Sequence, residues 1–189
     1  MTTWWWVRHG PTHRKDMIGW TDAPADLTDT DRLSALKTFL PSGAPVVSSD
    51  LIRAVDTASG FQGTRHRLPH TPNLREIHFG DWEARHFADI DQTDGALIRQ
   101  FWETPGAVRA PNGESWDDLC SRVNGFVDRM AHHKHVIAVA HMGVILTQVQ
   151  RARGVGAYDA LGQKIENFSV TKLRLDGATA RAELINHHP

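Results

Sequence analysis

The sequence predicts an α/β protein: a three-layer α/β/α sandwich around a mostly parallel central sheet that closes with a C-terminal hairpin. Two observations predict this fold class. Short apolar runs at 4–7, 46–50 and 136–140 alternate with longer segments whose apolar residues recur at helical spacing. Near the end of the chain, residues 168–175 and 180–185 flank an Asp-Gly pair, which is typical of a tight hairpin turn.

The first strand is expected over residues 4–7. Its consecutive tryptophans can alternate between the two faces of a sheet that is covered on both sides. Residues 10–26 contain glycines and prolines, and they form a loop long enough to have a function of its own. Thr28 or Asp29 can cap the helix that follows, which runs to about Leu40.

The next elements lead toward polar residues. The short strand at 46–50 ends in a helix that begins near Leu51 and carries Arg53 in its first turn. Residues 74–83 mix carboxylates, a glycine and aromatic side chains, which is typical of a loop beside a functional site. Residues 84–102 are expected to form one or two helices.

The clearest helix of the sequence lies within residues 114–133, where apolar residues recur at helical spacing. Cys120 belongs to that apolar stripe, and we interpret it as a core residue. The strand at 136–140 precedes a helix over about 144–153. Because no repeat or low-complexity segment divides the chain, we expect a single domain over residues 1–189.

The composition restricts the class of function. With 40% hydrophobic residues, 23% charged residues and a net charge of −1, nothing favours nucleic acid or a membrane surface as the main partner. The single cysteine excludes an intramolecular disulfide and a cysteine-rich metal site. No signal peptide and no apolar run of about 20 residues is present, so we expect a cytoplasmic protein. The sequence does not determine the oligomeric state, and a homodimer is one of the possibilities.

Histidines follow two of the expected strands. His9 comes directly after the first strand between Arg8 and Gly10, and His141 comes directly after the strand at 136–140. The carboxyl ends of parallel strands meet at one edge of a sheet, where open α/β folds bind ligands. Two histidines with arginines nearby indicate a site that handles an anion. The first hypothesis is phosphoryl transfer through a histidine nucleophile.

Four segments then identify a family that this sequence resembles. In order along the chain and at the family's usual separations, they match the histidine phosphatase superfamily, whose members are also called phosphoglycerate-mutase-like proteins. The resemblance spans residues 4 to about 150, and the segments are Arg8-His9-Gly10, Ser48-Ser49-Asp50-Leu51-Ile52-Arg53-Ala54, Leu74-Arg75-Glu76-Ile77-His78-Phe79-Gly80-Asp81-Trp82-Glu83 and Val139-Ala140-His141-Met142-Gly143-Val144-Ile145. The resemblance implies a small bacterial phosphatase that acts on a small-molecule phosphate ester and needs no metal or organic cofactor.

The resemblance assigns roles that suit the chemistry of each residue. His9 would accept the phosphoryl group, and Arg8 and Arg53 would hold phosphate oxygens with planar guanidinium groups. His141 would donate to the same oxygens, as its family counterpart does. Glu76 stands where the family has its general acid and base, so it would protonate the leaving oxygen and then activate water.

Some site residues stay open at this point. Glu83 is the main rival of Glu76 as proton donor, and Asp81 is a weaker one. Thr12 either contacts phosphate or caps the loop. Backbone N–H groups from Met142 onward, at the start of a helix, would add to phosphate binding.

The sequence also departs from the family pattern. Arg14 and Lys15 stand where many members have a Trp-Asn pair, and they either supply a cationic contact or are solvated loop charges. His132, His133 and His135 lack supporting carboxylates or cysteines, so we interpret them as a solvated cluster and expect no metal site.

Two alternative functions remain beside the phosphatase. The first is phosphoglycerate-mutase-type transfer, which the chain length disfavours because the mutases that resemble this core are longer and carry an inserted segment that excludes water. The second is a non-catalytic module that binds phosphoproteins. The presence of both His9 and Glu76 argues against it.

Overall fold

The structure of this chain is a computed structural model, and it describes residues 1–177 and 179–189. Two short 3₁₀ turns, η1 (Pro72–Leu74) and η2 (Gly80–Trp82), lie between the regular elements. In chain order, those elements are β1 (Thr2–Arg8), α1 (Thr30–Phe39), β2 (Val46–Ser48), α2 (Ile52–Phe61), α3 (Phe87–Glu103), α4 (Trp116–Arg129), β3 (His135–Ala140), α5 (Met142–Arg153), α6 (Ala157–Leu161), β4 (Val170–Asp176) and β5 (Thr179–His187).

The middle layer is a sheet with the strand order β2-β3-β1-β4-β5. Strand β3 pairs in parallel with both β2 and β1, whereas β4 pairs antiparallel with β1 and β5 pairs antiparallel with β4. The expected C-terminal hairpin is confirmed. The sheet is more evenly mixed than expected, because the hairpin adds its antiparallel strands directly beside β1.

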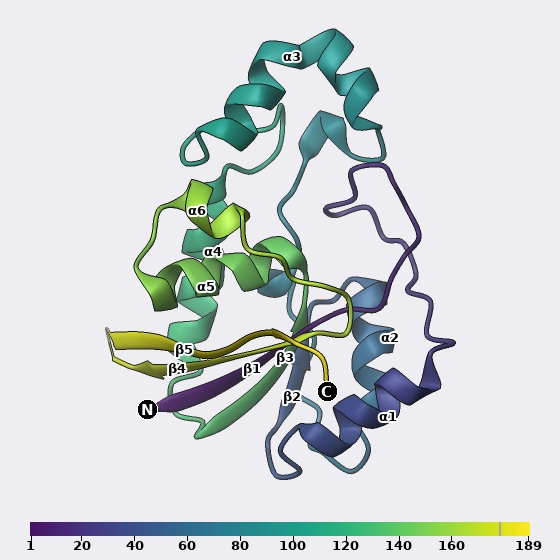
Figure 1. The fold of residues 1–189 in the computed structure, drawn as a ribbon, viewed down its shortest axis with the longest axis vertical. Coiled ribbons are helices and arrows are strands. Elements are labelled where there is room, and N and C mark those ends of the chain that lie inside the picture. Colours follow the sequence, from purple (N-terminus) through teal and green to yellow (C-terminus); the bar gives the residue numbers. More distant parts are fainter. Residues whose placement is uncertain (178) are drawn as a thin grey trace.

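Helices cover both faces of the sheet, which confirms the predicted α/β class and its three layers (Figure 1). Trp4 and Trp6 stack on each other on the face that packs against α4 and α5, with ring centroids 4.9 Å apart. Trp5 points to the opposite face and contacts Phe39 of α1. The alternating tryptophans therefore contribute side chains to the hydrophobic cores on both faces of the sheet.

Local capping explains where several helices begin and end. The Asp29 side chain accepts a hydrogen bond from the backbone of Arg32 at the start of α1, as expected. Ser115 and Asp118 form a reciprocal capping box at the start of α4. Helix α3 contains non-helical backbone at Asp94, so the expected region of one or two helices is two helical pieces joined at a kink.

Two elements differ from the expectation. Helix α5 begins at Met142 rather than near residue 144, because His141 itself is the N-terminal cap residue. Helix α6 occupies part of a region that the sequence patterns left unassigned, since its short length gives little periodicity. Among the described residues, no helix has both the length and the apolar character needed to cross a membrane.

The sheet topology places the candidate site. Arg8 at the end of β1 lies opposite Ala140 at the end of β3, and the backbone N–H of His9 donates to the Ala140 carbonyl at 3.1 Å. The residues that follow these two strands are therefore adjacent. In Figure 1, the loop after β1 and the segment before α3 extend beyond the sheet toward α3, which stands apart from the sheet.

Candidate active site

His9 is buried and neutral, and one of its ring nitrogens is free. The Nδ1 atom lies 2.6 Å from the Gly10 carbonyl oxygen, which can only accept, so Nδ1 carries the proton and Nε2 keeps its lone pair. Burial, followed by the nearby positive charge of Arg53, lowers the pKa of His9 to about 3. The Asn167 side chain holds the His9 carbonyl at 2.8 Å. His9 thus presents a neutral ring, fixed in orientation, with a lone pair on Nε2.

His141 lies beside His9, with the two ring centroids 5.0 Å apart, and is completely buried. Its Nδ1 accepts from Nε of Arg53 at 3.2 Å, so its proton is on Nε2. That Nε2 atom is buried and has no hydrogen-bond partner among the described residues. Burial and the charge of Arg53 hold the pKa of His141 well below its usual range. A buried donor without a partner suits an incoming oxyanion.

Arg53 sits in the first turn of α2 and is 1% exposed. Besides His141, its guanidinium donates to the carbonyls of Thr21 at 2.9 Å and Gly19 at 2.6 Å. Two N–H groups of the five therefore remain for a ligand. Burial lowers the pKa of Arg53 and of Arg8, but a guanidinium stays charged in a protein.

Arg8 projects from the end of β1 beside His9. It donates from Nη1 to the Ile165 carbonyl, and its buried Nε has no partner among the described residues. Together with Arg53, it gives the site two positive charges, one partly buried and one fully buried. These charges suit the non-bridging oxygens of a phosphoryl group.

Glu76 approaches the same place from the segment before α3. Its carboxylate accepts from the backbone N–H groups of Ile77 at 2.9 Å and Gly143 at 3.1 Å. A Cβ atom at position 143 would lie 2.3 Å from Oε1 of Glu76, so any residue other than glycine there would displace the carboxylate. The N-terminus of α5 therefore holds Glu76 in its present position through a close approach to Gly143.

Glu83 has a different environment. Its carboxylate accepts hydrogen bonds from the backbone N–H groups of Gly19, Trp20, Thr21 and Phe79 and from the Thr21 hydroxyl. Burial alone would raise the pKa of Glu83, but these hydrogen bonds outweigh it and lower the pKa. With its oxygens occupied in this way, Glu83 organises the loop at 19–21. The geometry therefore favours Glu76 over Glu83 as the proton donor.

Most of the predicted site residues share one cleft of about 410 Å³. His141 is not among the lining residues and is buried beside His9. The sequence reasoning missed Asn167, although β4 runs antiparallel to β1 and so begins at the edge where β1 ends. The cleft is lined by Arg8, His9, Pro11, Thr12, His13, Arg14, Asp16, Met17, Ile18, Arg53, Glu76, Phe79, Met142 and Asn167.

The residues left open by the sequence fall into two groups. Thr12 and Met142 both line the cleft, and the Thr12 hydroxyl also accepts from the backbone of Arg14 at 3.4 Å. Arg14 also lines the cleft, but its guanidinium pairs with Asp16, so its charge is already matched. Lys15 is exposed and does not line the cleft. The loop cations therefore offer the ligand little free positive charge.

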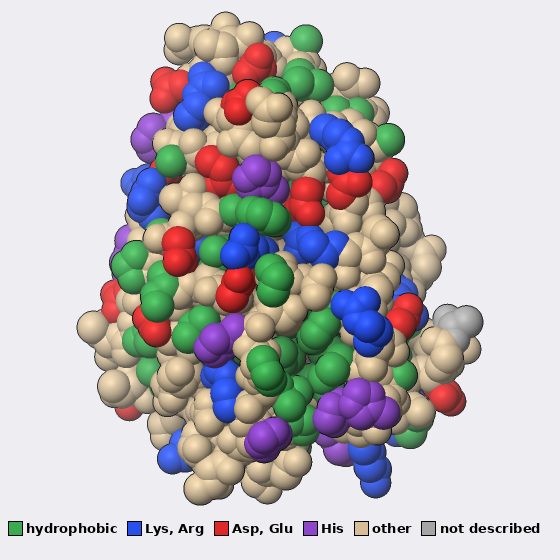
Figure 2. Space-filling view, turned by 180° about the vertical axis from the view of Figure 1, so that it is seen from behind, with side chains coloured by type: hydrophobic (Ala, Val, Ile, Leu, Met, Phe, Trp, Pro, Cys, Tyr) green, Lys and Arg blue, Asp and Glu red, His purple; other side chains and the backbone are tan. Residues whose placement is uncertain are grey.

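The charge of the site is local. Figure 2 shows a face of the molecule on which basic and acidic side chains are interspersed rather than gathered by sign. Within the cleft, the guanidinium groups of the partly buried Arg8 and the buried Arg53 are the positive charges placed to act on a bound anion. Within residues 1–177 and 179–189, no three histidine, cysteine, aspartate or glutamate side chains gather as a metal ion would require.

Comparisons with known proteins agree with this geometry. The model of the histidine phosphatase superfamily (branch 1) matches residues 4–188. The chain is 32% identical over 163 residues to the adenosylcobalamin/alpha-ribazole phosphatase of Escherichia coli strain K12, which covers 81% of this chain and 80% of the relative. It is also 32% identical to the Salmonella typhi protein of the same name, which covers 96% of this chain and 95% of the relative.

The solved structures extend the likeness to the whole fold. The alpha-ribazole phosphatase from Shigella flexneri superposes with a TM-score of 0.82 at 27% sequence identity. The superposition covers 99% of this chain and 97% of that protein.

Proposed function

This chain belongs to the histidine phosphatase superfamily, and we propose that it is a phosphomonoesterase that hydrolyses a small phosphorylated metabolite through a phosphohistidine on His9. The observation that carries the proposal is the state of His9. Its free Nε2 belongs to a neutral ring that shares a cleft with the guanidinium groups of Arg8 and Arg53 and with the Glu76 carboxyl group. These groups are the nucleophile, charge-stabilising donors and acid that phosphoryl transfer requires.

The first step forms the covalent intermediate. Nε2 of His9 attacks phosphorus, the bond between phosphorus and the ester oxygen breaks, and Glu76 in its acid form gives that oxygen a proton. Arg8, Arg53 and the Nε2–H group of His141 hold the non-bridging oxygens. Because these donors are already in place, little reorganisation is needed as charge moves during transfer.

The second step releases phosphate. The Glu76 carboxylate takes a proton from water, and the resulting nucleophile attacks the phosphohistidine. The phosphorus–nitrogen bond breaks, its electron pair returns to Nε2 of His9, and inorganic phosphate leaves. Glu76 has then regained the proton that it gave away, so the cycle closes with water as the only co-substrate.

The relatives suggest which substrate to test first. Two of them are named as phosphatases of alpha-ribazole, so alpha-ribazole phosphate leads a panel of nucleoside, sugar and amino acid phosphates. The paired state of Arg14 and Asp16 supports monophosphates over substrates that carry a second anionic group. Release of inorganic phosphate is measured for wild type, His9→Ala and Glu76→Gln, and acid-labile phosphoprotein is followed in parallel.

We expect wild type to release phosphate and His9→Ala to release none above background. Glu76→Gln should accumulate acid-labile phosphoprotein from a phenyl phosphate with a good leaving group, because water activation is lost. Wild-type turnover by His9→Ala would contradict the phosphohistidine mechanism. Transfer to an acceptor alcohol without phosphate release would establish the mutase instead, and tight phosphopeptide binding without turnover would establish the binding module.

A further inference from the structure

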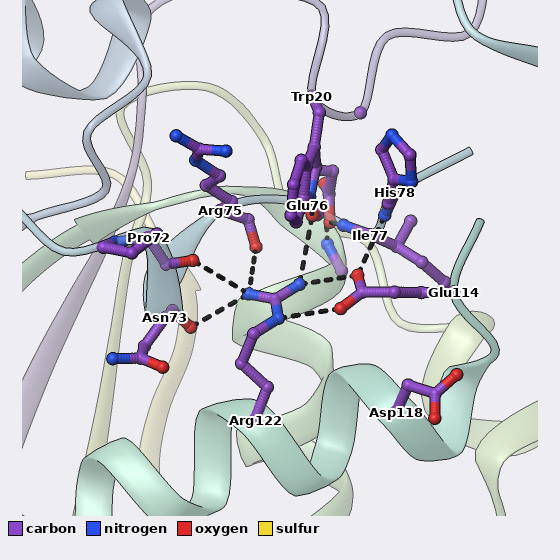
Figure 3. Close-up of polar contacts among 12 residues, drawn as sticks. Trp20, Pro72, Asn73, Arg75, Glu76, Ile77, His78, Glu114, Asp118 and Arg122 are labelled. Atoms are coloured by element: carbon purple, nitrogen blue, oxygen red, sulfur yellow. Dashed lines mark hydrogen bonds and ion pairs between the residues drawn. The ribbon is translucent and has the colours of Figure 1, made fainter. Parts of the chain in front are cut away.

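One arginine, Arg122, hydrogen-bonds much of the backbone that carries Glu76. Residues 72–76 belong to no strand of the sheet, and their carbonyl oxygens turn toward Arg122 on α4 (Figure 3). Nη1 of Arg122 donates to the carbonyls of Pro72, Asn73 and Arg75 at 3.4, 3.0 and 2.9 Å. Nη2 donates to the carbonyl of Glu76 itself at 3.2 Å. One guanidinium thus hydrogen-bonds four carbonyl groups of a segment that lies outside the sheet and the α-helices.

A second residue fixes Arg122 in turn. Glu114 accepts from Nε of Arg122 at 2.9 Å and from Nη2 at 2.7 Å, in the planar two-bond arrangement that arginine forms with carboxylates. Glu114 also accepts from the backbone N–H of His78 at 2.9 Å and donates its own N–H to the His78 carbonyl at 2.8 Å. Both side chains are mostly buried, at 16% and 17% exposed. The pair therefore holds the segment on both sides of Glu76.

The opposite side of the segment meets the loop after β1. Nε1 of Trp20 donates to the Glu76 carbonyl at 2.8 Å, so this carbonyl receives two hydrogen bonds, one from each side. The guanidinium of Arg75 lies over the Trp20 ring at 4.6 Å. The main chain of Glu76 is thereby held in place before a substrate binds, while its carboxylate lines the cleft.

We propose that Arg122, held by Glu114, is a positioning residue that sets the distance between the Glu76 carboxyl group and the leaving oxygen. The proposal rests on the proposed function, in which Glu76 is the general acid. Proton donation requires hydrogen-bond geometry, and a misplacement of about 1 Å can cost about a hundredfold in rate. Arg122 does not line the cleft, so it acts without touching the substrate. Its positive charge also helps to lower the pKa of His141, and Arg122→Lys keeps that charge while it removes the hydrogen bonds around Glu76.

The chain offers a matched control in Arg65. This buried arginine also donates to several backbone carbonyls, but they belong to the ends of α1 and α2, and none of the residues involved lines the cleft. Its acceptors are the carbonyls of Lys37, Leu40, Pro41, Phe61 and Gln62. Arg65→Lys therefore removes a comparable network without touching Glu76.

The experiment uses a series of phosphate monoesters whose alcohols range from dinitrophenol to simple alkyl alcohols. A poor leaving group needs the general acid, and a good one does not. We measure kcat/KM, which reports the steps through transfer to His9, for Arg122→Lys, Glu114→Gln, Glu76→Gln, Arg65→Lys and Arg122→Lys combined with Glu76→Gln. Thermal unfolding of each variant is recorded beside the kinetics.

We expect Arg122→Lys and Glu114→Gln to lose about 10- to 100-fold on alkyl esters and less than about threefold on dinitrophenyl phosphate. The double variant should be no slower than Glu76→Gln, because both changes remove the same proton donation. Arg65→Lys should lower the unfolding temperature without changing the dependence on the leaving group. If Arg122→Lys does not fold, Glu114→Gln, which leaves Arg122 in place but weakens its hold, decides the outcome.

An equal loss on both kinds of ester, or a double variant whose losses add, would overturn the positioning role. Failure of the proposed function looks different. In that case His9→Ala and Glu76→Gln would release phosphate as fast as wild type. If activity requires both His9 and Glu76 but Arg122→Lys lowers kcat/KM equally on all esters, the phosphatase mechanism stands and only the positioning role is rejected.

Discussion

Glu76 and Glu83 belong to one short stretch of chain, yet their carboxylates have opposite surroundings. Glu83 accepts from four backbone N–H groups and one hydroxyl, and it does not line the cleft. Glu76 accepts from two backbone N–H groups and does line it. A carboxylate has about four lone-pair positions. The saturated carboxylate of Glu83 therefore suits a structural role, and that of Glu76, which keeps free acceptor positions, suits the proton transfer that we propose.

The two carboxylates are nonetheless linked through the loop after β1. Glu83 binds the N–H groups of Gly19 and Thr21, while Arg53 binds the carbonyls of the same two residues. This loop thus links Glu83 to Arg53, the arginine that we propose binds phosphate. Under the proposed function, Glu83 would affect the position of the substrate, and Glu76 would affect protonation of its leaving group.

The sharpest test of this contrast is Glu76→Gln. We expect kcat/KM for alkyl phosphates to fall by about 10²- to 10⁴-fold, because the proton donor is lost. The unfolding temperature should fall less than in Glu83→Gln, because the amide NH₂ group opposes one backbone N–H while the amide oxygen still accepts from the other. Steady-state kinetics and thermal unfolding measure the two effects. Asp81→Asn, on an exposed carboxylate nearby, serves as the control and should leave both values unchanged.

Gly143→Ala tests the same carboxylate from the other side. A methyl group at this position would lie 2.3 Å from Oε1 of Glu76, so the carboxylate must move. We expect kcat/KM for alkyl phosphates to fall by about a hundredfold and that for dinitrophenyl phosphate to fall far less. Gly154→Ala at the other end of α5 is the control, because its φ of +62° strains the backbone and lowers stability while the new Cβ meets no neighbour. A uniform loss across esters would show that Gly143 matters for packing and not for the placement of Glu76.

Glu83→Gln should show the opposite behaviour. The amide keeps one acceptor oxygen and turns an NH₂ group toward backbone donors, so we expect the free energy of unfolding to fall by about 2 kcal/mol. Activity should decline to the same degree on all esters, because Arg53 and its loop shift together. Chemical denaturation gives the stability, and the ester series gives the selectivity. A loss confined to alkyl esters would mean that Glu83 takes part in proton transfer.

The smallest expected effect is on stability against pH. The folded-state pKa of His9, about 3, lies below the usual 6.5, so the unfolded chain binds more protons between these values and stability falls as the pH drops from 6.5. The loss should be about 1 kcal/mol for His9 between pH 6.5 and 5.5. The pKa of Glu83 is lowered from 4.5, so its contribution is lost only below that pH. Denaturation across pH for His9→Gln and Glu83→Gln separates the two ranges. An unchanged slope above pH 5.5 in His9→Gln would contradict the assignment.

The sequence alone determined the features that depend on neighbouring residues. An apolar run that ends in Arg8, His9 and Gly10 predicts both a strand and the edge at which it stops, and the helix cap at Asp29 is equally local. The parallel strand before His141 was predicted in the same way, so the pairing of the two histidines followed from topology. Residues whose chemistry is carried by short patterns could thus be placed without a structure.

Tertiary structure decided the features that depend on where distant backbone groups point. The choice between Glu76 and Glu83 rested on N–H groups from other segments, among them Gly143 at the start of α5 and the loop at 19–21. Arg122 looks like any charged residue on an amphipathic helix, because nothing in its neighbours reveals the carbonyls that converge on it. A hydrogen-bond network has no sequence period, since its partners come together only when the chain folds.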